Sequence, residues 1–134
     1  MKIEGWEKAL EDYLKVEQEN DFEWGLFDCC SFAGGAVEAM TGVNPYLDFM
    51  AEIGHAYHDE KTGRAFMERK GGLARILTRE FGHHVNDGVE GDLAYCVFPD
   101  GSAVGVLMGS HCIFRGETGL VAVDPIECRF FKVR

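Results

Sequence analysis

The sequence has little positive charge and no long apolar run. Only 13 Lys and Arg residues stand against 23 Asp and Glu residues, which gives the 134-residue chain a formal charge of −10. A strongly acidic chain is repelled by phosphate backbones and by anionic lipid headgroups. No apolar stretch approaches the roughly 20 residues that cross a bilayer. We therefore expect no nucleic-acid partner and no membrane insertion.

Closely spaced cysteine pairs of the CxxC type are also absent, although the chain has five cysteines. Zinc sites usually draw ligands from such pairs, so no metal is expected, and no motif indicates a cofactor. The N-terminus alternates charged and apolar residues and lacks the apolar core of a signal peptide, which predicts a cytosolic protein unless an assembly carries it out. Reduced thiols are the default there, and an odd number of cysteines argues against a disulfide framework.

What is present is ordinary globular composition, with 46% hydrophobic and 27% charged residues. This length and composition predict a single domain over residues 1–134. A period of 3.6 in the apolar residues predicts helices over 5–20 and from Cys29 to a C-cap at Gly42. Short helices with breaks are expected over 44–81, the last of them ending at Gly82.

After Gly82 the apolar period changes from 3.6 to 2. We expect strands over Asp92–Phe98, Ala103–Met108, His111–Phe114, Leu120–Val123 and Arg129–Val133. Short turns separate these strands, which predicts an antiparallel meander. Helices first and strands last is the α+β pattern, with the helical half packed on one face of the sheet.

One cysteine lies where a thiol is most easily made nucleophilic. Asp28 is a natural N-cap for the helix that starts at Cys29. The positive end of the helix dipole favours a thiolate at this position. A cysteine hydrolase also needs a base, a group that orients the base, and donors for the oxyanion.

Three stretches occur in a particular order along the chain, and the first of them includes this cysteine. They are Phe22-x-Trp24-Gly25-x-x-Asp28-Cys29-Cys30-x-Phe32, Gly91-Asp92-Leu93, and Ala103-Val104-Gly105-Val106-Leu107-Met108-Gly109. The pattern resembles the NlpC-type cell-wall cysteine peptidases, small papain-like enzymes that cut the peptide stems of peptidoglycan. The resemblance implies a compact papain-like α+β domain.

A phage-encoded branch of that fold, found among tail genes, is similar over nearly the whole chain. The shared residues are Trp-Gly-x-x-Asp-Cys-Cys-x-Phe-Ala, Thr41-Gly42, Gly71-Gly72, Gly91-Asp92 and Gly119-Leu120, in this order. The resemblance implies a protein made in the bacterial host cytoplasm and present in the virion tail if it is assembled there. Its partners would be other phage tail proteins.

Most of the family's catalytic parts have no counterpart here. The resemblance places Cys29 at the nucleophile, but Ala103 falls on the catalytic histidine. The third member falls near Phe114 or Arg115, and Phe22 replaces the tyrosine that supports the oxyanion. Nucleophile, base and orienting group act as a unit, so a lone thiol retains little rate enhancement. Trp24 and Asp28, together with Phe22, would then form only the rim of a cleft.

Another histidine could replace the missing base. His111 is the best candidate, although a turn separates it from Ala103 and should place it at the far end of the sheet from Cys29. His83 and His84 flank a loop, and isolated histidines are usually surface or structural groups. Without a base, Cys29 and Cys30 behave as small buried hydrophobic residues.

The remaining three cysteines have simpler interpretations. Cys96 and Cys128 fall in predicted strands and read as core or sheet-face residues. Cys112 adjoins His111, but neighbouring strand residues point to opposite faces, which makes joint chelation of a metal awkward.

The sequence favours a structural component of a phage or prophage tail tip or baseplate, on a peptidase fold that has lost its chemistry. This function follows from resemblance alone, because a fold does not imply a function. One alternative is a peptidoglycan endopeptidase or amidase that uses Cys29 with an unrecognised base. Another is a module that binds peptidoglycan without cutting it.

Overall fold

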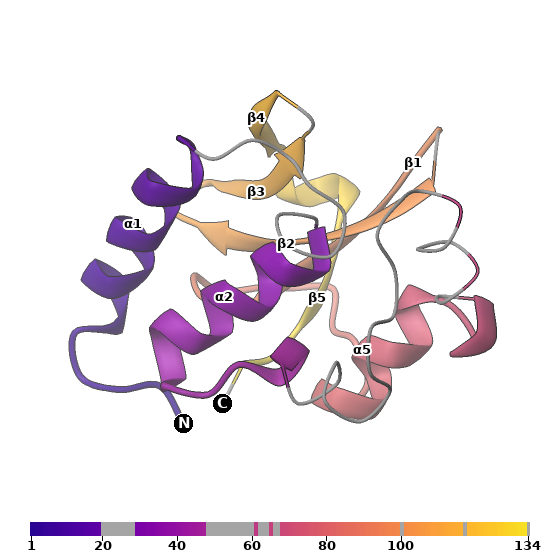
Figure 1. Ribbon diagram of the computed structural model, residues 1–134, viewed down its shortest axis with the longest axis horizontal. Coiled ribbons are helices and arrows are strands. Elements are labelled where there is room, and N and C mark those ends of the chain that lie inside the picture. Colours follow the sequence, from indigo (N-terminus) through magenta and orange to yellow (C-terminus); the bar gives the residue numbers. More distant parts are fainter. Residues whose placement is uncertain are drawn as a thin grey trace.

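The computed structural model describes residues 1–19, 29–47, 61, 65, 68–99, 101–116 and 118–133. Within them, the helices come first and the strands last (Figure 1). The helices are α1 (Trp6–Glu17), α2 (Cys29–Thr41) and α5 (Leu73–Phe81), and a short 3-10 helix η1 (Pro125–Glu127) lies late in the chain. The strands are β1 (Leu93–Phe98), β2 (Gly101–Met108), β3 (His111–Gly116), β4 (Gly119–Val123) and β5 (Arg129–Phe131). The α+β prediction is confirmed.

The five strands form one antiparallel sheet in the order β4-β3-β2-β1-β5. Strands β1 to β4 form the predicted meander, but the prediction that β5 continues it is wrong. The chain turns through η1 and returns to the other edge of the sheet, where Phe131 pairs with Leu93 of β1. Phe131 is 2% exposed there. The return to β1 therefore buries an aromatic side chain in the core.

Helix α2 lies across strand β2, with α1 along one side of it and α5 at the other (Figure 1). The apolar side chains between these helices and the sheet form the main core. Its members are Leu10, Leu14, Phe32, Ala33, Ala36, Val37, Met40, Leu73, Leu77, Leu93, Val104, Val106, Phe131 and Val133. Among the described residues, no helix is long and apolar enough to cross a bilayer.

A second core lies on the opposite face of the sheet. It consists of Ala94, Cys96, Leu107, Cys112, Phe114, Cys128 and Phe130. Successive strand residues point to opposite faces, so β2 sends Val104 and Val106 to the main core and Leu107 to the second core. This alternation decides which residues of β2 can face α2.

Glycines allow the close approach of neighbouring elements at two places. A Cβ at Gly105 would collide with the backbone carbonyl of Ile113 on β3, which explains a glycine between two buried valines. A Cβ at Gly35 of α2 would collide with the Tyr13 hydroxyl of α1. That hydroxyl donates to the Phe32 carbonyl at 2.8 Å. Burial, and then the Glu17 carboxylate, raise the pKa of Tyr13, so it stays a donor.

An ion pair holds the turn before β1 against the chain's C-terminal residues. Asp92 is 1% exposed, and its Oδ2 accepts from Lys132 Nζ at 2.7 Å and from the Val89 backbone N–H at 2.8 Å. Its Oδ1 is buried without a hydrogen-bond partner. Removing the lysine would leave a buried carboxylate without its cation.

We expect Lys132→Met to lower the free energy of unfolding by at least about 2 kcal/mol in urea titrations. Breaking a fully buried pair costs about 3–5 kcal/mol, and the 29% exposure of the Lys132 side chain reduces that figure. Lys8→Met is the matched control, because its pair with Asp12 is exposed on both sides and, like most surface pairs, should contribute little to stability. Equal effects of the two variants would show that the buried Asp92 pair stabilises the fold no more than an exposed pair does.

Candidate functional site

Two adjacent thiols open helix α2. Cys29 is the first helical residue, as predicted, and both Cys29 and Cys30 are half-buried against the main core. The residues predicted to cap the helix and to form the cleft rim, Asp28, Phe22 and Trp24, lie outside the described residues. Those three predictions therefore stay predictions.

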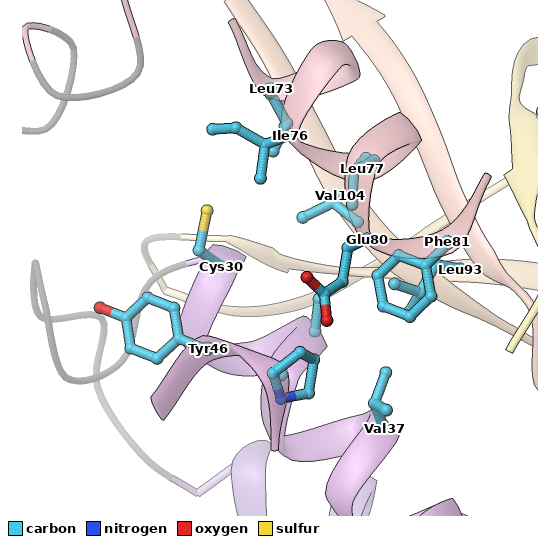
Figure 2. Close-up of a pocket in the computed structure, with 13 residues that line it drawn as sticks. Cys30, Val37, Tyr46, Leu73, Ile76, Leu77, Glu80, Phe81, Leu93 and Val104 are labelled. Atoms are coloured by element: carbon cyan, nitrogen blue, oxygen red, sulfur yellow. The ribbon is translucent and has the colours of Figure 1, made fainter. Parts of the chain in front are cut away.

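An apolar cavity of about 70 Å³ lies beside the start of α2, between this helix, α5 and the sheet (Figure 2). Its lining residues are Cys30, Ala33, Gly34, Val37, Pro45, Tyr46, Leu73, Ile76, Leu77, Glu80, Phe81, Leu93 and Val104. A cavity of about 150 Å³ holds benzene, so this smaller one suits a group such as the branched end of an aliphatic side chain.

The segment after α2 closes one side of the cavity because Gly34 has no side chain. A Cβ at Gly34 would collide with Asn44 Oδ1 and Tyr46 Cβ. Asn44 Oδ1 instead accepts from the Tyr46 backbone N–H at 3.0 Å and so fixes this turn. The turn places the Tyr46 ring next to Cys30 (Figure 2).

Helix α5 supplies the opposite wall. Its apolar positions recur at helical spacing, and Leu73 and Leu77 are buried while Ile76 and Phe81 are half-buried. Figure 2 shows the Cys30 sulfur directed towards this helix. Among the described lining residues, Glu80 is the charged one, and it is exposed. The site is therefore an apolar cavity with a carboxylate at its rim.

On the sheet side, Leu93 of β1 and Val104 of β2 line this cavity, and Val104 lies on the strand that also carries Ala103. Val104 is 1% exposed and lines the cavity with Cys30. Ala103 pairs with Cys96 of β1 and packs against the second core, on the other face of the sheet. The position that the family resemblance assigns to the catalytic histidine therefore points away from α2.

His111 is exposed at the turn end of β3, where it pairs with Met108 of β2. Met108 is four residues beyond Val104, which is about 13 Å at 3.3 Å per residue. The His111 Nδ1 lies 3.0 Å from the Ser110 hydroxyl. The structure does not bring this candidate base to the cavity. The other two histidines of the described residues, His83 and His84, are exposed as well.

Phe114 and Arg115, where the resemblance places the third catalytic member, have structural contacts. The Phe114 ring packs edge-on against Phe98 in the second core, at 5.5 Å between ring centroids. Arg115 is buried, and its Nη1 donates to the backbone carbonyl of Glu17 at the end of α1. Arg115 therefore ties β3 to α1. In the part of the chain that the structure describes, no group of three His, Cys, Asp or Glu residues could hold a metal ion.

The model of one protein family, described as "Domain of unknown function (DUF6950)", matches residues 1–133. The chain belongs to this family. No curated protein and no solved structure matches it. For this DUF6950 member, the geometry of the chain's own residues therefore carries the argument on function.

Sequence reasoning missed the cavity and two of its lining residues, Cys30 and Glu80. The apolar stripe of α5 was visible in the sequence as a helix, and it was the signal that could have pointed to a lipophilic surface. Nothing in the sequence placed that stripe opposite Cys30.

We expect iodoacetamide to modify Cys29 and Cys30 of the folded protein at least about tenfold faster than the three second-core thiols at pH 8. The first two are half-exposed, whereas Cys96, Cys112 and Cys128 are at most 8% exposed. Burial also raises the pKa of Cys112 and Cys128, so less thiolate is present at any given pH. Site-resolved mass spectrometry measures the rates, and equal rates at all five sites would contradict this burial pattern.

Proposed function

We propose that this chain is a non-catalytic interaction module of a phage or prophage tail, on a fold similar to that of the NlpC-type cysteine peptidases. The apolar cavity between α2 and α5 is its docking site. The partner is a tail protein that inserts a small aliphatic side chain into the cavity and places a basic group near Glu80.

One observation carries the non-catalytic part of this proposal. The sheet side chains that line the cavity with Cys30 are Leu93 and Val104, and neither can accept a proton. A cysteine nucleophile needs a base within hydrogen-bond reach. The three described histidines, His83, His84 and His111, are exposed and do not line the cavity.

The tail assignment rests on the order of shared motifs along the chain, which is similar to that of the phage-encoded branch. The chemistry of the partner rests on charge. The chain has a formal charge of −10, and Glu80 is the charged residue at the cavity. An acidic surface attracts basic partners and accelerates their encounter.

We expect a phage that carries Cys29→Ala to form plaques at the wild-type titre. The proposal gives this thiol no chemical step, and alanine fits a half-buried helix start. Plaque counts and electron micrographs of tails measure the outcome. If Cys29→Ala phage assembled normal tails but failed to infect, the result would support the peptidoglycan hydrolase instead.

A charge reversal at the cavity rim tests the docking site. We expect Glu80→Lys to reduce incorporation of the protein into tails by at least about tenfold, the effect of losing roughly 1.4 kcal/mol of binding free energy. Glu80 is exposed, so the variant should fold, and circular dichroism checks this. Glu90→Lys is the matched control, because Glu90 is exposed and does not line the cavity. Equal incorporation of both variants would exclude the rim as a contact.

A further inference from the structure

Three cysteines from separate parts of the chain meet in the second core. Cys96 lies on β1, Cys112 on β3, and Cys128 between η1 and β5. Their exposed fractions are 5%, 0% and 8%. None of them takes part in the proposed docking site, because that site lies on the other face of the sheet.

Cys128 is the central member of this group. After burial, the neighbouring Cys112 thiol is the strongest influence that raises the pKa of Cys128, and the Cys96 thiol follows, so both lie close to it. The Cys96 thiol donates to the Glu127 carbonyl at 3.5 Å, and the Cys128 thiol donates more weakly to the Asp124 carbonyl at 4.0 Å. Within this cluster, Cys112 is therefore the thiol that interacts most strongly with Cys128.

A route from solvent leads to this pair. Cys128 lines an open groove of about 530 Å³ between residues 86–88 and 125–130, and the groove walls include polar residues such as Asn86 and Asp87. Cys112 has no exposed surface. A small oxidant that enters this groove reaches Cys128 before it reaches Cys112.

Neither a metal site nor a permanently reactive thiol fits these residues. No described cluster has an arrangement that could hold a metal ion. Burial raises the pKa of both Cys112 and Cys128, which keeps them protonated and slows their oxidation. The pair stays reduced in a reducing cytosol and reacts when the oxidant persists.

We propose that Cys112 and Cys128 are an oxidation site that closes to a disulfide when the folded protein meets a peroxide. The Cys128 sulfur attacks one peroxide oxygen, the O–O bond breaks, and Cys128 becomes a sulfenic acid while water or an alcohol leaves. The Cys112 sulfur then attacks the sulfenic sulfur, forms the S–S bond and releases a second water. With hydrogen peroxide, the two thiols lose two electrons and two protons, and two waters form.

The disulfide would tie the segment before β5 to strand β3. It closes the loop that contains β4 and η1. A loop of this size restricts the unfolded chain enough to raise the Tm by roughly 10 °C.

The test treats the native protein with hydrogen peroxide well below its Tm and maps it by mass spectrometry without reduction. We expect one peptide pair linked through Cys112 and Cys128, two hydrogens lighter than the separate peptides, and a Tm gain that dithiothreitol reverses. Cys96→Ala is the control variant that should keep both the link and the gain, whereas Cys112→Ala should lose both.

Any other product overturns the proposal. Three results would do so: Cys112 and Cys128 remain unmodified thiols, Cys96 is linked to Cys128 instead, or Cys128 is oxidised to a sulfinic acid without forming a link. The wild-type map decides between these outcomes even if a variant fails to fold. The docking proposal is unaffected by this result, because its residues lie on the opposite face of the sheet.

Discussion

The close apolar contact between α2 and strand β2 is the constraint on which the rest of the structure depends. Burying one large apolar side chain contributes about 1.5–3 kcal/mol, and Phe32, Met40 and Val106 are almost completely buried along this contact. The same contact sets the chemistry of the site. Cys30 lies at the start of α2, and the sheet residues that line the cavity with it are Leu93 and Val104. This interface is filled with apolar side chains, and their burial stabilises the core.

Much of the fold was predictable because its signals are local. The start of α2 at Cys29, its end before Gly42 and the end of α5 before Gly82 follow from helical periodicity and C-cap glycines, which act within a few residues. The four strands of the meander follow from short turns. The position of β5 was not predictable, because pairing with β1 depends on residues far apart in the chain. The two aromatic residues of β5 lie in different cores, as the alternation of strand residues predicts. That alternation does not show which strand lies beside β5.

The candidate site was only half predictable for the same reason. The resemblance drew attention to Cys29 and to the missing histidine at Ala103. The register of β2 in the sheet decides which of its residues face the helix. Val104 faces it, whereas Ala103 packs against the second core. A shift of one residue along a strand exchanges its two faces. Motif matching alone therefore could not show that a histidine at Ala103 would point away from the thiol. The cavity itself arises from three elements that meet only in the folded chain.

The central claim is that the fold carries no peptidase chemistry, and digestion of peptidoglycan tests it most directly. Purified protein is incubated with sacculi and with soluble muropeptides, and new amine termini are counted by mass spectrometry. The account predicts no new termini above a no-protein control, from the wild type or from Cys29→Ala. Release of stem-peptide fragments by the wild type that disappears in Cys29→Ala would contradict it. That result would require a base near Cys29 and would make the hydrolase the working function.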